Sequence, residues 1–573
     1  MTAVIPNPSD TRKGPKQSPA ARPAWRVDIA GVDAADLFPV KWQLYLALAG
    51  LGIGVAQGLI QALERVNVRL YEQLPLSQSY YQGLTLHGVA LAFVFTFCFA
   101  NALMPLMAMK GYQRPMISRT VANASLWCAW GGTALATWAI LANDATVLFT
   151  FYSPLKAQPA FYIGAVLLVV STWLTFANVA FTTKAWKRDH PGERTPLPSY
   201  MSMITGLMWS LASLGVAIEV VGFLLPWSFG LTDKVDPQFN RILFWFTGHP
   251  IVYFWLLPAY MCWYLVLPEV SGKGKLYSDG LARLSFLGFL LLLPVGVHHQ
   301  FTDPGVPISS KGIMWLLTWV LFMPSLVTMF SVLSALENAG RNRGGKGLLG
   351  WIWKLPWGNP VVSGQLLAGI AFMLGGASGL INSSYTINLV VHNTSFIVGH
   401  FHLTVGTAVA LTIMAVSYSL VPYLTGKALW GRRIAVAQTW TWFIGVAVFS
   451  RGQMMGGLES MPRRTQISKA VYLDQNGWTL ANRLTAVGGT IMFIGGVLFF
   501  VVLFGTLMSK RHVTEPQEIP IVTAIHGPRD TWAALDQFVI WAAIAMLLVV
   551  LVYGEVIAHY WPLNLVSKGI KVW

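Results

Sequence analysis

Runs of roughly twenty apolar residues recur along this chain between short polar connections, and a helical run of that length crosses a bilayer. The pattern therefore predicts an all-α polytopic membrane protein with a bundle of about thirteen transmembrane helices. The predicted spans are residues 42–62, 82–109, 120–141, 159–183, 200–226, 241–267, 284–303, 312–336, 361–383, 394–424, 433–456, 483–508 and 533–560.

Composition and charge agree with this class and add an orientation. Of the 573 residues, 55% are hydrophobic and 11% are charged, with a mean hydropathy of +0.55. Lysine and arginine are more than twice as frequent before the first span and in the connections on that side as on the other side. Cytoplasmic loops carry such an excess, so we expect a cytoplasmic N-terminus and a C-terminus outside. The net charge of +16 then orients the chain in membrane lipid, and no nucleic-acid partner is expected.

The first forty residues are polar and lack the short apolar core and cleavage site of a secretory signal. We expect residues 1–40 to form a disordered cytoplasmic tail and residues 41–573 a single membrane domain. The three cysteines, Cys98, Cys128 and Cys262, share no close spacing, which predicts neither a disulfide framework nor a thiolate metal site.

The most informative polar residues are histidines inside the apolar spans. Ionisable or metal-binding side chains at membrane depth are costly and usually functional. Helical rise places six of them, on four spans, in one layer near the outer face. One buried histidine is usually a core residue, but six at one depth predict a metalloenzyme. They are His87, His249, His298, His299, His400 and His402.

Spacing assigns these histidines to different sides. His400 and His402 are two apart, so they face opposite sides of a helix and one helix can serve two metal centres. Pro294 permits a kink before His298 and His299, and these two with His249 could supply three imidazole ligands to copper or another transition metal. Tyr253 follows His249 by four residues and shares its helix face.

The motifs GHPIVY, VGVHHQ, VHNTSFIVGHFHL, LTLHG and MPRR around these residues resemble those of subunit I of the haem-copper oxygen reductases, the terminal cytochrome oxidases. The resemblance covers essentially the whole chain. Ile251 stands where many members carry a glutamate, and the thirteenth span exceeds the usual twelve. Both features resemble the B family, the enzymes of the Thermus cytochrome c oxidase type.

This resemblance implies a role for each histidine. His87 and His402 would bind a low-spin haem, and His400 would bind a high-spin haem, with each haem of b or a type. His249, His298 and His299 would hold copper B opposite the high-spin haem, and oxygen would bind between them. Tyr253 would be the tyrosine that is linked to His249 in this family and that supplies an electron and a proton when the O–O bond breaks.

Polar residues near the outer face would hold the haem propionates. Arg463 and Arg464 suit these anionic groups, although a positive loop end at a membrane surface would look the same. His392 and Asn393 are further candidates, and Asp303 could join the layer.

Oxygen reduction consumes protons, so a polar route from the cytoplasm is expected. Tyr260 and Tyr264 continue the stripe below Tyr253, and the predicted span at 312–336 carries three hydroxyls at intervals of three. Such hydroxyls can also serve helix packing alone, but their match to the B-family proton channel favours transport. These hydroxyls belong to Ser325, Thr328 and Ser331. The absence of a glutamate at position 251 argues against a second channel.

Two residues depart from simple expectation. Asn388 stands where Thermus-like enzymes are expected to carry an aspartate, so a pump that uses that carboxyl would need another group here. Arg451 lies inside a predicted span, and a buried guanidinium there would need an anion or a polar cavity.

The expected function is that of the catalytic subunit of a respiratory terminal oxidase in a bacterial or archaeal plasma membrane. It would reduce oxygen to water, coupled to proton uptake and proton pumping. Its implied partners are a subunit II with binuclear copper A, a cytochrome c or small copper protein as electron donor, and a small single-helix subunit. A quinol-fed variant stays open.

Three alternatives remain. A nitric oxide reductase shares the histidine pattern, but Tyr253 argues against it. A secondary transporter would more typically show repeated halves or broken helices. A haem-binding structural protein would consume no oxygen.

Overall fold

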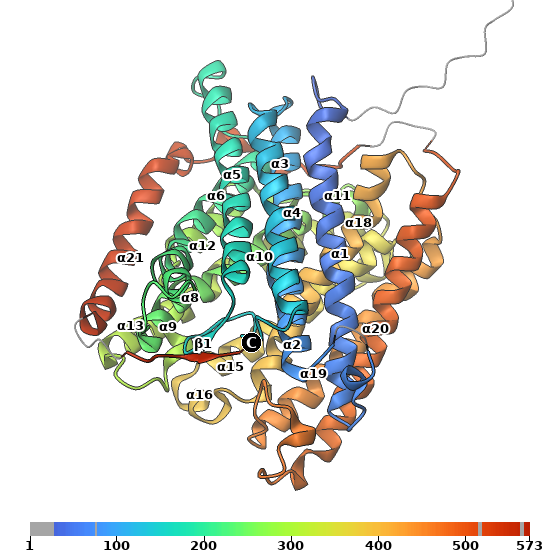
Figure 1. Cartoon of the computed structure of the whole chain (residues 1–573). Helices are drawn as coiled ribbons and strands as arrows, with labels where there is room; N and C mark the ends of the chain where they lie inside the picture. Colours follow the sequence, from blue (N-terminus) through green and yellow to red (C-terminus); the bar gives the residue numbers. More distant parts are fainter. Residues whose placement is uncertain (1–27, 75–76, 514–517, 562–565, 573) are drawn as a thin grey trace, which may run out of the picture.

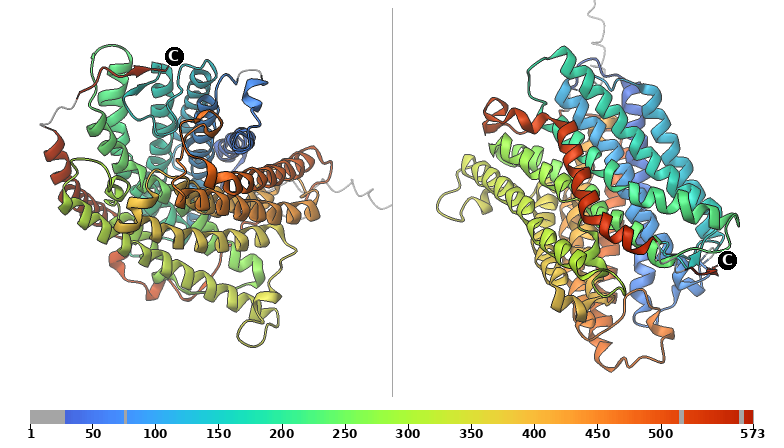
Figure 2. Two further views of the ribbon diagram at one scale, coloured as in Figure 1. Left: turned by 90° about the horizontal axis from the view of Figure 1, so that it is seen from below. Right: turned by 90° about the vertical axis from the view of Figure 1, so that its left-hand side faces the viewer.

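The computed structural model describes residues 28–74, 77–513, 518–561 and 566–572. It is one bundle of long helices packed side by side, with α20 and α21 at opposite edges (Figures 1 and 2). The helices of the first half are α1 (Ala34–Glu64), α2 (Tyr80–Val89), α3 (Thr96–Tyr112), α4 (Arg119–Leu141), α5 (Pro159–Asp189), α6 (Leu197–Ala212), α7 (Leu214–Ala217), α8 (Leu225–Ser228), α9 (Pro237–Gly248), α10 (Pro250–Leu265) and α11 (Leu267–Gly272).

The second half is also helical. Its helices are α12 (Asp279–Leu291), α13 (Ile308–Val320), α14 (Phe322–Asn342), α15 (Pro360–Ser383), α16 (Tyr385–Val391), α17 (Ser395–Leu403), α18 (Ala410–Thr425), α19 (Arg432–Leu458), α20 (Thr479–Met508) and α21 (Phe538–Tyr560). The strands β1 (Leu155–Lys156) and β4 (Ile570–Lys571) pair in parallel, as do β2 (Leu276–Ser278) and β3 (Ala524–His526).

Short π-helical segments interrupt three spans where the sequence pattern shows no break. Segment η2 (Ala90–Phe95) follows His87, η3 (Ile218–Leu224) joins α7 to α8, and η6 (Thr404–Val409) follows His402. Such segments insert an extra residue into a helix and occur often at functional sites.

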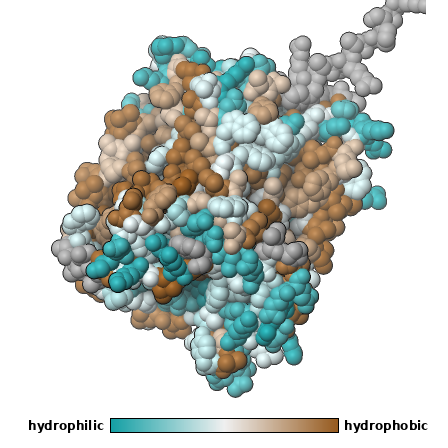
Figure 3. All heavy atoms as spheres, in the orientation of Figure 1, coloured by the Kyte–Doolittle hydropathy of each residue, from teal (hydrophilic) through white to brown (hydrophobic). Residues whose placement is uncertain are grey.

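The membrane class is confirmed. In the described part of the chain, eleven helices are long and apolar enough to cross a membrane. Hydrophobic side chains gather around the middle of the bundle, while hydrophilic ones gather towards its ends (Figure 3). The start of α1 and strand β4 lie towards opposite ends of the bundle, as an odd number of crossings requires (Figure 1). The count of thirteen and the cytoplasmic side of the N-terminus stay predictions.

Two of the thirteen predicted spans are not among these eleven helices. The segment predicted at 433–456 is one helix, α19, which is 27 residues long but does not meet the criterion of apolarity. The segment predicted at 284–303 is not one continuous helix, because α12 ends at Leu291 and a 3-10 helix η4 (Gly296–Gln300) follows. Pro294 lies between the two and cannot donate a helical hydrogen bond.

The first span begins earlier than predicted. Asp33 caps α1 by accepting hydrogen bonds from the amides of Ala35 and Asp36, so residues 34–40 are helical. The rest of the predicted disordered tail falls largely on residues 1–27, which lie outside the described residues.

Close backbone contact joins α19 and α20. A Cβ atom at Gly445 would lie 2.7 Å from the Met492 nitrogen, and one at Gly488 would lie 2.3 Å from the Phe449 nitrogen. Small residues let membrane helices approach in this way.

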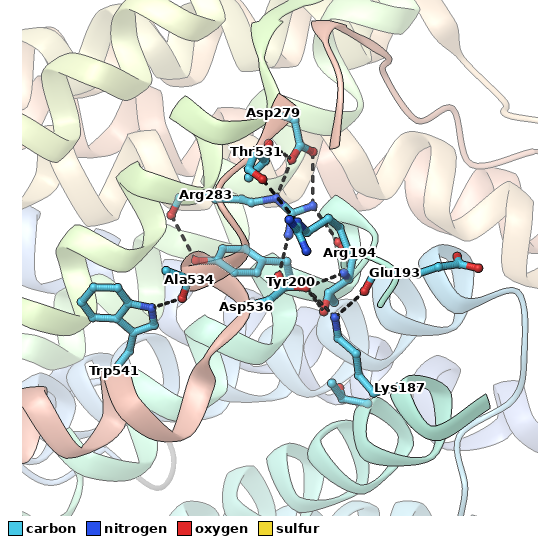
Figure 4. Close-up of polar contacts among 12 residues, drawn as sticks. Lys187, Glu193, Arg194, Tyr200, Asp279, Arg283, Thr531, Ala534, Asp536 and Trp541 are labelled. Carbon is cyan, nitrogen blue, oxygen red and sulfur yellow. Dashed lines mark hydrogen bonds and ion pairs between the residues drawn. The ribbon is translucent and has the colours of Figure 1, made fainter. Parts of the chain in front are cut away.

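A buried ion cluster ties α21 to the rest of the bundle (Figure 4). Arg283 on α12 has no exposed surface and donates to Asp279 at 2.5 Å, to Asp536 at 3.0 Å and to the Thr195 carbonyl at 2.6 Å. Asp536 also binds Lys187 at 2.5 Å and accepts from the Thr195 amide at 2.7 Å. Because Asp536 lies two residues before α21 begins, these bonds fasten α21 to α12 and to the region of α5 and α6.

Replacing Arg283 with methionine should leave buried carboxylates without their cation. Removing one partner of a buried ion pair typically lowers stability by about 3 kcal/mol or more, so the Arg283→Met variant should unfold at clearly lower temperature in a thermal melt of the purified protein. The matched control is Arg341→Met, because the pair of Arg341 with Glu337 is more than 40% exposed at both side chains. Equal melting temperatures for both variants would contradict the structural role of this cluster.

Candidate metal and cofactor centre

All six histidines singled out in the sequence line one internal cavity of about 500 Å³. The other lining side chains are mostly leucine, valine, phenylalanine and glycine. The cavity therefore suits a large apolar ligand that carries a few polar groups. The structure therefore brings these six histidines together around one cavity.

His87 on α2 and His402 on α17 face each other across one part of the cavity. Their rings are nearly parallel, with an interplanar angle of 12° and centroids 6.4 Å apart. A bond from a metal to an imidazole nitrogen is about 2 Å long, so two rings on opposite sides of one metal have centres roughly 6 Å apart. The spacing between His87 and His402 therefore fits a single metal ion between them.

Backbone carbonyls determine which nitrogen of each imidazole ring carries the hydrogen. Nδ1 of His87 lies 2.7 Å from the Gly54 carbonyl oxygen, and Nδ1 of His402 lies 2.8 Å from the Val398 carbonyl oxygen. A carbonyl only accepts, so each Nδ1 carries the hydrogen. Each Nε2 keeps its lone pair for a metal.

His400 points to the opposite side of α17, as its spacing from His402 predicts. Its Nδ1 lies 3.0 Å from both the Gly375 carbonyl oxygen and the Ser378 hydroxyl on α15, which again leaves Nε2 free. A Cβ atom at Gly379 would lie 2.9 Å from the His400 ring, so a side chain there would displace the imidazole.

His249, His298 and His299 form a compact group of possible metal ligands. One ligand atom of each lies within 4.8 Å of the others, and Nδ1 of His249 is 2.9 Å from Nε2 of His299. His249 sits at the break between α9 and α10, where Pro250 cannot donate a helical hydrogen bond. Trp245 stacks on His299, with centroids 4.1 Å apart.

Thr318 orients His298, and the sequence analysis did not identify this threonine. Its hydroxyl donates to the Met314 carbonyl at 2.6 Å and lies 2.9 Å from Nδ1 of His298. Since the hydroxyl hydrogen is already used, Nδ1 of His298 donates to Thr318 and Nε2 stays free. Thr318 lies outside every histidine motif, so no sequence pattern indicates its role.

Tyr253 lies beside the histidine trio, as predicted. Its ring meets that of His249 edge-on, with centroids 4.9 Å apart. Its side chain is buried, and its hydroxyl, like Nε2 of His249, has no hydrogen-bond partner among the described residues. Both residues line the cavity, and both atoms are without a partner among the described residues.

Two arginines border the cavity near one end of the bundle. Arg463 donates to the Asn393 side chain at 2.8 Å, and Arg464 lies over the rings of Phe149 and Tyr152. Neither makes an ion pair within the described ranges 28–74, 77–513, 518–561 and 566–572. Burial and the neighbouring Arg464 lower the pKa of Arg463 to about 9. An anion bound here would offset both effects.

The other residues predicted for this polar layer are also present. Nδ1 of His392 donates to the side-chain oxygen of Asn388 at 3.2 Å, and its Nε2 has no hydrogen-bond partner among the residues described. Burial and Arg463 lower the pKa of His392 to about 4, so its ring is neutral at pH 7. Asp303 forms an ion pair with Arg241 at 2.9 Å, so its carboxylate already has a partner and is less available to another ligand.

Hydroxyl groups line part of the predicted proton route. Tyr260 donates to Ser325 at 3.4 Å, and Tyr264 donates to Thr328 at 3.1 Å. Ser331 lies buried beside Tyr264, although no described residue forms a hydrogen bond with its hydroxyl oxygen. The described contacts include no direct bond from Tyr260 to Tyr253, but the cavity reaches both Tyr253 and Ser325.

Ser285 on α12 belongs to the same cluster of hydroxyl side chains, and the sequence analysis did not identify it. It donates to the Pro324 carbonyl at 3.0 Å and lies 2.7 Å from the Thr328 hydroxyl. Thr328 must therefore donate to Ser285, which leaves the Thr328 oxygen free to accept from Tyr264. Ser285 is a lone hydroxyl in its helix, so the sequence offers no periodic signal for it.

Arg451 does not have the buried position that its place in a predicted span suggested. Its side chain is exposed on the outside of α19 and does not line the cavity. The need for a buried anion or polar cavity therefore does not arise.

Comparison with known proteins decides the family. Residues 38–491 match the family described as cytochrome C and quinol oxidase polypeptide I. The chain belongs to this family. The match covers most of the helical bundle and every one of the six histidines, which confirms the resemblance inferred from the motifs.

Individual members of the oxidase family show how far the similarity extends. The chain is 45% identical to cytochrome c oxidase subunit 1 of Thermus thermophilus, over 92% of this chain and 96% of that protein. It is 27% identical to cytochrome c oxidase polypeptide 1 of Halobacterium salinarum, over 87% and 81% of the two chains. A cryo-EM structure of a haem-copper terminal oxidase dimer matches with a TM-score of 0.87 and 36% identity, over 92% of this chain and 93% of that one.

Thr318→Val should weaken the metal centre of this oxidase while it preserves side-chain volume. Groups that orient metal-bound histidines typically change metal affinity by roughly tenfold or more, so the copper-to-iron ratio of the purified protein should fall. Elemental analysis measures this ratio. Thr441→Val is the control, because the Thr441 hydroxyl bonds only to Ala437 of its own helix. Unchanged copper content in Thr318→Val would show that Thr318 does not support the site.

Proposed function

We propose that this chain reduces oxygen to water with the six histidines of its central cavity as ligands, and that it takes up the necessary protons through the hydroxyl groups below Tyr253. The chain is the catalytic subunit I of a haem-copper oxidase, and its family binds a low-spin haem, a high-spin haem and copper B. The proposal adds the role of each residue.

The observation that carries the proposal is the fixed orientation of the imidazoles around one cavity. His87 and His402 would hold the low-spin haem between their free Nε2 atoms. His400 would hold the high-spin haem from the opposite face of α17. His249, His298 and His299 would hold copper B, as their closeness and the free Nε2 of His298 support. When bound, the irons and the copper supply the redox chemistry of oxygen reduction.

Charge at the end of the cavity supports the binding of haem propionates there. Arg463 and Arg464 offer two guanidinium groups to two anionic substituents. Asn393 orients Arg463, and His392 presents an unused Nε2 in the same layer. These contacts would fix the haems in register with the histidines.

Tyr253 would deliver a proton from its hydroxyl oxygen towards the histidine trio. Tyr260, Ser325, Tyr264, Thr328 and Ser331 would restore that proton from the cytoplasmic side. The cavity between Tyr253 and Ser325 provides the space for this transfer. The N-terminus would then lie in the cytoplasm of this multi-pass plasma-membrane protein.

Electrons would come from a partner. The three cysteines of this chain are free, and they lie apart in the sequence, so the chain offers no cysteine pair for a binuclear copper A centre. We propose that a subunit II holds copper A and receives electrons from a cytochrome c or a small copper protein. A small single-helix subunit would complete the complex.

The test is metal analysis of the purified complex combined with reduced-minus-oxidised spectra and oxygen uptake under a chemical electron donor. Two haems and one copper per chain, beyond any copper in subunit II, with cyanide-sensitive oxygen uptake, are the expected result. Iron in place of copper B, with turnover on nitric oxide, would overturn the proposal in favour of a nitric oxide reductase. A protein without haem would overturn the ligand assignments altogether.

The proton route can be tested at Thr328, the centre of its hydroxyl contacts. Thr328→Val removes the hydroxyl with little change in volume, and loss of a proton-transfer group lowers rates by roughly 100-fold. Oxygen uptake should fall accordingly while the haem spectra stay unchanged. Ser334→Ala is the control, since the Ser334 hydroxyl bonds only to the Ser331 carbonyl of its own helix. Equal oxygen uptake in both variants would remove Thr328 from the route.

A further inference from the structure

Glu219 is a carboxyl group inside the membrane that the proposed mechanism does not use. It lies on η3, within a predicted span that carries no other Asp, Glu, Lys or Arg from residue 197 to residue 228. Only 1% of its surface is exposed, and neither carboxyl oxygen has a hydrogen-bond partner among the described residues. Ionisable side chains in this setting are rare and usually functional.

The surroundings of Glu219 favour a neutral carboxylic acid. An isolated carboxylate in an apolar medium is far less stable than its protonated form. In the described structure no lysine or arginine makes an ion pair with Glu219. The nearest element in sequence with a cation is α9, where Arg241 is already bound to Asp303 at 2.9 Å. Glu219 therefore holds a proton at rest.

Glu219 lies one helical turn beyond the wall of the histidine cavity. Val216, three residues before it, lines the cavity, and the Val216 amide donates to Thr247 at 2.9 Å. Thr247 also lines the cavity and is two residues from His249. On helix α5, which packs against η3, Ala165 lines the same cavity. Glu219 does not itself line the cavity; it lies between the residues that do and the end of the span, where Ser228 donates to the Ala157 carbonyl beside β1.

Tyr162 occupies the corresponding position on α5, three residues before Ala165. It is fully buried, on a helix that packs against η3. Its oxygen accepts a hydrogen bond from the Ala157 amide at 3.2 Å, so its own hydrogen stays available for donation. Ala157 directly follows β1, at the end of the bundle where β1 and β4 pair (Figure 1).

We infer that Glu219 and Tyr162 form a proton-transfer site that connects the histidine cavity with the outer surface beside β1. The inference rests on the proposed function, because its proton supply is the uptake that accompanies oxygen reduction. Glu219 loses its proton towards the outer surface and regains one from the cavity side. Tyr162 relays the proton by giving up its hydroxyl hydrogen and accepting another. Only O–H bonds form and break, and no electrons move at this site.

The other titratable groups on the elements packed against η3 are already paired, belong to the histidine trio, or lie at the other end of the bundle. On α9 they are Arg241, which Asp303 neutralises, and His249 at its end, which belongs to the histidine trio. On α5 the remaining charged residues, from Lys184 to Asp189, lie at the opposite end of the helix. On the span of Glu219 itself, Tyr200 lies at the far end, beside Arg283.

The test uses the complete oxidase and two independent readouts. Glu219→Gln keeps the shape of the side chain but cannot exchange an acidic proton. Redox-induced infrared difference spectra should show, in the unaltered enzyme, the carbonyl band of a protonated carboxylic acid that shifts in D₂O. This band should be lost in Glu219→Gln. With the enzyme in lipid vesicles, the number of protons released outside per electron should also fall towards zero, while oxygen uptake in uncoupled vesicles persists.

Two further variants make the result decisive. Glu555→Gln removes an exposed carboxyl on α21 that binds Ser309 and Ser310, and it should retain both the band and the proton ratio. Tyr162→Phe should retain the band at a shifted position and lower the proton ratio, which also tests the site if Glu219→Gln fails to assemble. An unchanged band and an unchanged ratio in Glu219→Gln, with normal haem spectra, would overturn the inference. Failure of the unaltered enzyme to show haems or oxygen uptake would instead contradict the proposed function.

Discussion

The centre of this protein depends on hydrogen bonds from imidazole Nδ1 atoms to backbone carbonyls. The carbonyls of Gly54, Gly375 and Val398 lie inside helices α1, α15 and α17, and the lone pair that the helix does not use accepts a hydrogen bond from His87, His400 and His402. These bonds fix the ring orientation and expose Nε2. Two of them also join different helices, α2 to α1 and α17 to α15, so the same contacts hold helices together and orient the ligand atoms.

Irregular backbone supplies the geometry that straight helices cannot. The π-helical segments η2 and η6 begin within three residues of His87 and His402, and breaks at Pro250 and Pro294 accompany the histidine trio. Each irregularity turns the chain locally, so side chains from consecutive helices can converge on one cavity. A π segment or a proline break leaves backbone groups unpaired, and in a membrane these groups need hydrogen-bond partners from neighbouring helices, polar side chains or water.

The sequence predicted the class of the fold and the main site residues, because both depend on regular patterns. Apolar runs predict the spans, and a separation of two residues requires His400 and His402 to face opposite sides. The path of the chain around Pro294 was only partly predicted, since a proline permits a kink but does not say where the next helix begins. The prediction that Arg451 is buried was wrong, because an apolar run shows how deep a residue lies in the membrane but not which face of its helix packs against the bundle. Thr318 and Ser285 escaped notice because their partners lie on other helices.

The ion cluster around Arg283 has a consequence for biosynthesis. Asp536, one of its two carboxylate partners, follows Arg283 by 253 positions. A ribosome makes α12 long before it makes Asp536, so during synthesis Arg283 must rely on Asp279 and the Thr195 carbonyl alone. The Asp279 end of α12 reaches its final electrostatic balance only once Asp536 has been made. Fastening of α21 to α5, α6 and α12 is therefore a late step, after the preceding helices have already been made.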